Sequence, residues 1–114
     1  MAEAGPLEIP LEITVADLDG WRRAARPLAI LDVREPWERA ICAFAGSIDI
    51  PLAELPGRLD ELPGDRAVVV VCHHGMRSLQ ATRWLRGQGR GLACNLQGGI
   101  DAWAGQIDAA MERY

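Results

Sequence analysis

"VVVVCHHGMRSLQATRWL", residues 68–85, places four consecutive valines directly before a cysteine, a short loop and an apparent helix. A segment that is apolar at consecutive positions is typical of a strand buried on both faces, as in a parallel sheet. The helix is expected over about residues 78–86, where Gly87 and Gly89 would stop it. This stretch therefore predicts a strand, a loop and a helix, with Cys72 at the carboxyl end of the strand.

The rest of the chain repeats this alternation of strands and helices. Further strands are expected near Glu12 and Ile13, in PLAILDV (27–33), in GSIDIP (46–51) and in LACNL (92–96). Further helices are expected over residues 15–25, 36–39 and 100–104, with short helical turns in residues 52–63. Thr14 is the predicted N-cap of the first helix, and Asp17 stands at its third position. The expected fold class is α/β, a three-layer α/β/α sandwich around a parallel sheet.

Length and composition indicate one ordinary globular domain. The chain has 114 residues, of which 49% are hydrophobic and 25% charged. A single domain over residues 1–114 is expected, with a flexible start over about residues 1–6. The twelve basic residues are all arginine and do not cluster, and the net charge of -4 argues against nucleic-acid binding.

Membrane association and secretion also lack sequence support. No apolar run approaches the roughly 20 residues that a membrane span needs. The first ten residues show no basic segment followed by an apolar one. We therefore expect a cytoplasmic protein with no membrane partner.

The three cysteines, Cys42, Cys72 and Cys94, are odd in number and have no C-x-x-C spacing. Neither a disulfide framework nor a zinc site is indicated. Cys42 and Cys94 lie in apolar patterns without a basic partner, so they are interpreted as core or half-buried thiols. Oxidative linkage of Cys72 to one of them remains an open hypothesis.

The loop after Cys72 has the features of an anion cradle. Arg77 follows Cys72 after four residues, and the expected helix begins at Ser78. The positive end of that helix, inward-facing backbone amides and the Arg77 guanidinium would each favour a thiolate at Cys72. Gly75 is expected to adopt a positive φ that turns an amide toward the sulfur. Cys72 and Arg77 are therefore the candidate catalytic residues.

The other residues of this loop are candidate substrate contacts. His73, His74 and Met76 are expected to line the mouth of the pocket beside Gly75 and Ser78. Thiolate attack on a sulfur atom needs no general base, so neither histidine is required as a proton shuttle. Adjacent side chains in a tight loop generally diverge, and no third ligand lies nearby in the sequence. No metal site is therefore predicted.

The segment DVREPWE, residues 32–38, is interpreted as support for the site. Asp32 ends its strand at the same sheet edge as Cys72, where parallel sheets gather functional loops. We expect Asp32 to accept hydrogen bonds from loop amides, and Arg34 to pair with Glu38 across the following turn. The Gly98-Gly99 pair is read as a tight turn into a helix. Trp37 and Trp103 are expected to be partly exposed.

Three segments together resemble the single-domain rhodaneses, a family of sulfurtransferases. They are LDVREPWERAICAFAGSIDIPLAELPGRLDEL (31–62), VVVVCHHGMRS (68–78) and NLQGGIDAWAGQID (95–108). The resemblance implies a five-stranded parallel sheet with the cysteine strand at its centre. It also implies that Cys72 takes a sulfane sulfur from a donor such as thiosulfate and passes it, as a persulfide, to an acceptor such as cyanide or a thiol. The transferred atom rides on the protein itself, so no metal or organic cofactor is expected.

Other activities of this fold remain as alternatives. Cdc25-type phosphatases and arsenate reductases, as the resemblance implies, use a loop one residue longer, so the four residues between Cys72 and Arg77 favour sulfur transfer. A second alternative is a sulfur-carrier or sensing module that delivers persulfide sulfur to a thiol-containing partner protein. The physiological donor and acceptor and the oligomeric state are open. The intact Cys72 and Arg77 argue only against a degenerate binding domain.

Overall fold

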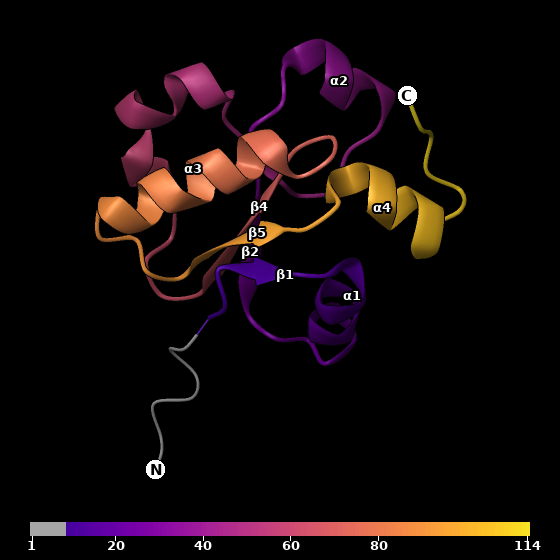
Figure 1. Ribbon diagram of the computed structural model, residues 1–114, viewed down its shortest axis with the longest axis horizontal. Helices are drawn as coiled ribbons and strands as arrows, with labels where there is room; N and C mark the ends of the chain where they lie inside the picture. The colour runs from indigo at the N-terminus through magenta and orange to yellow at the C-terminus, as the bar shows by residue number, and fades with distance from the viewer. Residues whose placement is uncertain (1–8) are drawn as a thin grey trace.

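Five parallel strands form one sheet in the computed structural model, which describes residues 9–114 (Figure 1). The strands are β1 (Glu12–Ile13), β2 (Leu28–Asp32), β3 (Ile48–Asp49), β4 (Ala67–Val71) and β5 (Ala93–Leu96). Their order across the sheet is β1-β5-β4-β2-β3, and every neighbouring pair is parallel. The strand that precedes Cys72 is therefore central, as predicted. The flexible start expected over about residues 1–6 lies outside the described residues.

The helices follow the predicted alternation. They are α1 (Val15–Arg23), α2 (Pro36–Ile41), the 3-10 helices η2 (Leu52–Gly57) and η3 (Leu59–Glu61), α3 (Met76–Gly87) and α4 (Gly99–Gln106). Thr14 and Asp17 form the predicted cap, because each side chain accepts a hydrogen bond from the other residue's backbone N–H. The prediction that α1 reaches residue 25 was wrong, because Ala25 adopts a φ of 55°, outside the helical region.

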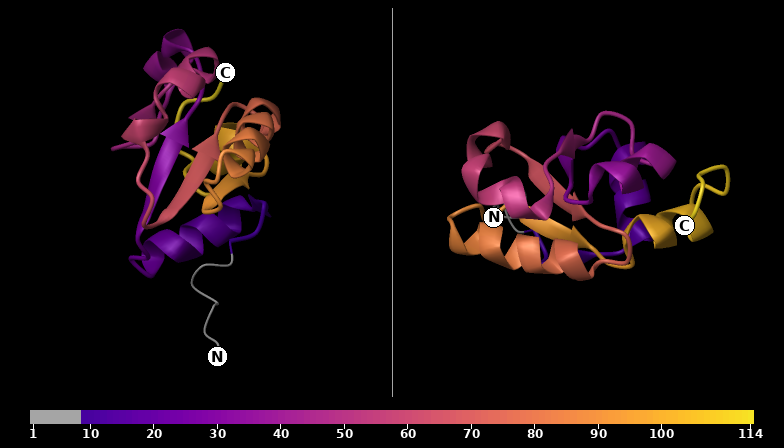
Figure 2. Two further views of the ribbon diagram at one scale, coloured as in Figure 1. Left: turned by 90° about the vertical axis from the view of Figure 1, so that its left-hand side faces the viewer. Right: turned by 90° about the horizontal axis from the view of Figure 1, so that it is seen from above.

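The valines of β4 explain why this strand is apolar at every position. Val69 and Val71 pack in one hydrophobic cluster with side chains of α1 and α4. Val68 and Val70 pack in a second cluster with side chains of α3, η2 and the segment after η3. Successive side chains of a strand point to opposite faces, so a sheet covered on both sides needs apolar residues at each position. The predicted three-layer sandwich is confirmed (Figures 1 and 2).

The two tryptophans expected at edge loops differ in exposure. Trp37, on α2, is largely exposed, as predicted. Trp103, on α4, is buried in the first cluster and packs on Phe44, with the two ring centroids 5.1 Å apart. The prediction that Trp103 is partly exposed was wrong, because its packing partner Phe44 lies far from it in the sequence and could not be inferred from local pattern.

Within residues 9–114, no helix has both the length and the hydropathy to cross a bilayer.

The segments after β4 and β5 are joined backbone to backbone. The Ile100 N–H donates to the Cys72 carbonyl at 2.9 Å, and the Asp101 N–H donates to the His73 carbonyl at 3.1 Å. Gly99 has a φ of 64°, and a Cβ at this position would overlap those two carbonyl groups. The Gly98-Gly99 pair is thus the predicted turn into a helix, and its small size lets the start of α4 fix the loop that follows Cys72.

Candidate active site

The sulfur of Cys72 lies at the N-terminus of α3. Cys72 follows β4 directly and is 1% exposed. Its Sγ accepts hydrogen bonds from the backbone N–H of Gly75 at 3.1 Å and of Ser78 at 3.3 Å. The Ser78 N–H is the third of the helix, the one that an N-cap side chain commonly satisfies. The sulfur therefore occupies a place that favours negative charge, with two amides directed at it.

Gly75 shapes this cradle through its backbone. It is the N-cap of α3 and has the predicted positive φ, 100°. A Cβ here would lie 3.1 Å from the Gly98 nitrogen and 3.3 Å from the Leu96 carbonyl oxygen. The prediction that the helix begins at Ser78 was wrong by two residues, because the turn at Gly75 leads directly into the helix. Met76 and Arg77 consequently belong to the first turn of α3.

The hydroxyl of Ser78 connects the sulfur to a residue that sequence reasoning missed. Ser78 Oγ lies 3.2 Å from Cys72 Sγ and also donates to Asn95 Oδ1 on β5. The Asn95 Nδ2 donates to the Gly75 carbonyl at 3.1 Å and to Glu12 Oε2 at 2.9 Å. Both of those partners are acceptors, which fixes the amide with its oxygen toward Ser78. The sequence signal for Asn95 was a single amide in an otherwise apolar strand, since a polar side chain buried there needs hydrogen-bond partners.

Arg77 is directed at Glu38. Its Nη1 and Nη2 donate to Glu38 Oε2 and Oε1, each at 2.8 Å. Glu38 also accepts from the Glu35 N–H at 3.0 Å and from the Tyr114 hydroxyl at 2.8 Å. The hydrogen bond from Arg77 is the main cause that lowers the pKa of Glu38 to about 2. Arg77 is thereby held in an ion pair that joins α3 to α2, and its expected catalytic role stays a prediction.

Asp32 and Arg34 form a second ion pair, which is fully buried. Arg34 Nη2 donates to Asp32 Oδ2 at 2.7 Å, and Arg34 Nε donates to Asp32 Oδ1 at 3.0 Å. Asp32 also accepts from the Arg34 backbone N–H at 3.0 Å, a loop amide as predicted. The expected pairing of Arg34 with the Glu38 side chain was wrong: Arg34 reaches only the Glu38 carbonyl, at 3.4 Å, because the carboxylate is bound to Arg77.

The remaining donors of Arg34 tie three segments together. Arg34 Nη2 donates to the Cys42 carbonyl at 2.7 Å, and Arg34 Nη1 donates to the Tyr114 hydroxyl at 3.0 Å. Burial by itself would lower the pKa of Arg34, but the hydrogen bonds to Asp32 and Tyr114 outweigh burial and raise it. Burial also raises the pKa of Tyr114 to about 12, so its hydroxyl keeps the proton that it donates to Glu38.

The pH dependence of stability should show the Glu38 ion pair. The pKa of Glu38 falls from 4.5 to about 2 on folding, so the pair stabilises the fold above pH 4.5 and is lost as the pH falls toward 2. The contribution is at most about 3 kcal/mol. We expect urea unfolding at several pH values to show this loss, and Glu38→Gln to be less stable at pH 7 with a flatter profile between pH 5 and 2. An equally steep profile in Glu38→Gln would contradict the assignment.

His73 and His74 stack on one another, with ring centroids 3.9 Å apart and planes inclined by 26°. The expectation that adjacent side chains diverge was wrong here. The cause is Tyr114, whose ring stacks on His73 at 3.8 Å with an inclination of 7°. Burial, followed by the neighbouring His74, lowers the pKa of His73, so this ring is neutral at pH 7.

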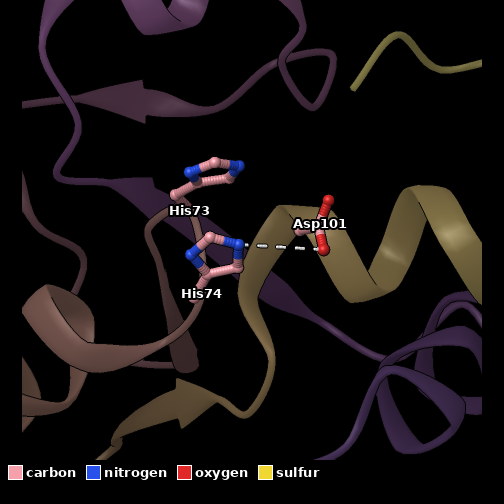
Figure 3. A group of neighbouring side chains, drawn as sticks. All are labelled: His73, His74 and Asp101. Atoms are coloured by element: carbon pink, nitrogen blue, oxygen red, sulfur yellow. Dashed lines mark ion pairs between the residues drawn. The ribbon is translucent and has the colours of Figure 1, made fainter. Parts of the chain in front are cut away.

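Asp101 on α4 completes a group of three potential metal ligands with the two histidines, all within 4.8 Å of one another (Figure 3). His74 Nε2 lies 3.8 Å from Asp101 Oδ2. The Asp101 carboxylate is already held by Arg113 through two hydrogen bonds of 3.1 Å. Stacked, nearly parallel rings direct their lone pairs side by side, whereas one metal ion needs ligand atoms that converge. This arrangement favours the expected role of the two histidines, which is to line the mouth of the pocket, over metal binding.

The other two cysteines are half-buried and buried, as their apolar local sequences predicted. Cys94 is buried among the side chains packed against α1 and α4, and burial raises the pKa of its thiol to about 12. It pairs with Val69, three residues before Cys72, which places the two Cα atoms about 10 Å apart along the strand direction. A disulfide spans at most about 7 Å between Cα atoms, so Cys72 cannot reach Cys94 without breaking the sheet. Cys42 is half-buried, and its linkage to Cys72 stays a hypothesis.

Comparison with known proteins gives consistent matches. The family model described as rhodanese-like domain matches residues 14–106. A sulfurtransferase of Allochromatium vinosum is 43% identical over 75 residues, which cover 66% of this chain and 70% of that protein. The probable adenylyltransferase/sulfurtransferase MoeZ of Mycobacterium tuberculosis is 39% identical over 104 residues, 90% of this chain but only 26% of MoeZ. The crystal structure of a rhodanese-related protein from Thermoplasma volcanium is 34% identical with a TM-score of 0.74, over 86% of this chain and 94% of that one.

Proposed function

The chain belongs to the rhodanese-like domain family, and from that premise we propose that it transfers sulfane sulfur through a persulfide on Cys72. The observation that carries this proposal is the position of the Cys72 sulfur at the start of α3, where the Gly75 and Ser78 amides donate to it. In the first step the thiolate attacks the outer sulfur of a donor such as thiosulfate, the S–S bond breaks, and sulfite leaves with the electron pair. In the second step an acceptor such as cyanide or a thiolate takes that sulfur, and the Cys72 thiolate is restored.

Each loop residue has a proposed part in this cycle. The two amides stabilise the negative charge on the sulfur, while the Ser78 hydroxyl, 3.2 Å from it, donates its one proton to Asn95. His73, His74 and Met76 form the entrance for the donor. Asp32 and Arg34 support the loop as a buried ion pair and do no chemistry. Because the sulfur stays covalently bound to the protein, the cycle needs no metal or organic cofactor. A cytoplasmic location stays a prediction.

The ion pair of Arg77 supports sulfur transfer over phosphate or arsenate chemistry. A phosphatase of this kind needs a guanidinium that clamps the oxyanion. Here both terminal nitrogens of Arg77 are bound to Glu38 at 2.8 Å. The four-residue loop between Cys72 and Arg77 leaves room for one extra sulfur atom and is cramped for a tetrahedral oxyanion.

A sulfur carrier that serves a protein acceptor is the second candidate function. The observation that favours it is the exposure of Trp37 and Met76, which flank the Glu38–Arg77 pair at 63% and 75%. Exposed apolar side chains next to this ion pair are a surface on which a partner can dock. Labelled sulfur that passes from Cys72 to cellular proteins, with little turnover of small acceptors, would favour the carrier. Ping-pong turnover of small molecules at physiological concentrations would favour the enzyme.

Intact-mass measurement tests the proposal directly. The chain is incubated with thiosulfate or an alkyl persulfide, freed of donor and weighed. We expect a gain of one sulfur atom, located by peptide mapping on Cys72, and its loss on addition of cyanide with formation of thiocyanate. If no donor loads the protein, or if the sulfur maps to Cys42 or Cys94, the proposed function is wrong.

A further inference from the structure

Residues 107–114 lie outside the family match and form no helix or strand. They follow α4 directly, and we call them the C-terminal strap. Figure 1 shows this yellow segment turning back from the end of α4 toward α2. Hydrogen bonds and ring contacts connect its last residue to α2 and to the loop after β4. The strap thus leads back to the segments that carry the site.

One side chain of the strap, Tyr114, reaches two parts of the site at once. Its hydroxyl donates to Glu38 Oε1 at 2.8 Å and accepts from Arg34 Nη1 at 3.0 Å. Its ring lies nearly parallel to that of His73, with the two centroids 3.8 Å apart. His73 directly follows Cys72 in the chain. Tyr114 therefore joins α2 to the loop that carries the sulfur.

The stacked position of His73 leaves one of its ring nitrogens unsatisfied. No group of residues 9–114 makes a hydrogen bond to His73 Nε2, although this atom is buried. A buried polar atom without a partner costs free energy, which it recovers when it meets water. Displacing the Tyr114 ring would expose His73 to water and so recover part of the free energy that the lost stacking contributed.

The strap is attached to the domain by side chains and not by its backbone. In the part of the chain that the structure describes, the strap beyond Asp108 makes one backbone–backbone hydrogen bond, from the Met111 N–H to the Asp108 carbonyl inside the strap itself. Met111 is only partly buried against the first cluster. Arg113 pairs with Asp101 at 3.1 Å, but the Arg113 side chain is 54% exposed. Segments held in this way open locally at a low cost in free energy.

The other attachments of the loop belong to the framework of the fold. The carbonyls of Cys72 and His73 accept from backbone N–H groups at the start of α4. The Cys72 sulfur accepts from the Gly75 and Ser78 amides at the start of α3. Cys72 is 1% exposed, so a reagent reaches its sulfur only when some contact of the loop opens. The stacking of Tyr114 on His73 can open without the loss of a backbone–backbone hydrogen bond.

We propose that the C-terminal strap is a lid on the Cys72 loop. With Tyr114 seated on His73 the sulfur is shielded, and release of Tyr114 opens the loop to donors and acceptors. The amides that face the sulfur keep their places in both states. The fraction of molecules with a released strap then sets the rate at which the sulfur is reached. This regulation of the site rests on the proposed function of Cys72.

Alkylation of Cys72 by iodoacetamide under native conditions tests the lid without any sulfur transfer. Peptide mapping follows the labelling of each cysteine separately. We expect Tyr114→Ala to raise the rate constant at Cys72 by at least about tenfold, because the strap loses one ring stack and its hydrogen bonds to two charged groups. Tyr114→Phe keeps the ring, so its rate constant should lie between those of Tyr114→Ala and the unaltered protein. An unaltered rate constant in Tyr114→Ala would overturn the inference.

Two controls separate opening of the strap from a general loss of stability. Cys94 is buried in the core, so it should stay unlabelled while Cys72 reacts. If Tyr114→Ala fails to fold and Cys94 is labelled in step with Cys72, the decision passes to Tyr114→Phe, in which faster labelling of Cys72 with Cys94 protected supports the lid and no change refutes it. Glu112→Gln alters an exposed residue of the same strap and should leave the rate constant at Cys72 unaltered.

The pH profile of labelling distinguishes a lid from an electrostatic effect of Tyr114 on the sulfur. Iodoacetamide reacts with the thiolate, so the rate rises with pH through the pKa of Cys72. A lid changes access to the thiolate, so Tyr114→Ala should raise the rate by the same factor at every pH. A shifted midpoint with an unaltered plateau at high pH would mean that Tyr114 acts on the charge of the sulfur, and the inference would be wrong.

Failure of the lid and failure of the proposed function give different results. Faster alkylation in Tyr114→Ala, with no sulfur loaded on Cys72 from any donor, would support the lid and refute sulfur transfer. Sulfur loading of Cys72, with an unaltered alkylation rate in Tyr114→Ala, would refute the lid alone.

Discussion

Cys72→Ser is expected to abolish sulfur loading and thiocyanate formation while the chain still folds. A serine hydroxyl stays protonated at neutral pH and cannot hold a sulfane sulfur. Its oxygen can still accept the hydrogen bonds that the Gly75 and Ser78 amides now donate to sulfur, so the loop keeps its partners. Thiocyanate formation from thiosulfate and cyanide should fall to the uncatalysed rate, with a circular dichroism spectrum like that of the unaltered protein.

Cys42→Ser is the matched control for this variant. Cys42 is half-buried beside Arg34, at 3.9 Å from its Nη1, and has no part in the proposed cycle. It should load sulfur and turn over as the unaltered protein does. Retained thiocyanate formation in Cys72→Ser would refute the assignment of the nucleophile.

The second large effect is expected from Asp32→Ala. Removing the carboxylate leaves the Arg34 guanidinium fully buried without its charged partner. Breaking one side of a buried pair destabilises proteins by about 3–5 kcal/mol. Urea unfolding at pH 7 should show this loss, and the loop after β4 should lose order because Asp32 and Val71 are register partners. A fully stable but inactive Asp32→Ala would instead place Asp32 among the catalytic residues.

A double variant separates the missing charge partner from lost packing. Asp32→Leu combined with Arg34→Met removes both charges and keeps apolar volume. It should be more stable than Asp32→Ala, because no unpaired charge remains in the interior. It should stay below the unaltered protein, since the hydrogen bonds of Arg34 to Cys42 and Tyr114 are lost. A double variant no more stable than Asp32→Ala would show that the ion pair is not the source of the effect.

Sequence reasoning succeeded where the determinants are local. The run of valines predicted a strand buried on both faces because every position of β4 faces a covered side of the sheet. Gly75 predicted a positive φ because the loop must turn within a few residues. Thr14 and Asp17 predicted a cap because both partners lie within one helical turn.

The missed features are pairings between distant parts of the chain. Arg77 and Glu38 are 39 positions apart, and Tyr114 and Glu38 are 76 apart. Local pattern gives the type of each side chain but not its partner, so Glu38 was matched with the nearby Arg34. Likewise, the stacking of the two histidines depends on the Tyr114 ring. The ion pairs of Arg77 with Glu38 and of Arg113 with Asp101 could therefore be assigned only from the structure.

The central place of β4 has a consequence for how firmly the nucleophile is anchored. Its backbone pairs with β2 on one side and β5 on the other, and Cys72 follows it without an intervening residue. Amide protons of such a strand exchange with deuterated solvent only through large-scale opening of the molecule. Amide hydrogen exchange at Val69 and Val70 under native conditions should accordingly be among the slowest in the domain. The reactive sulfur is therefore attached to the part of the sheet that opens least often.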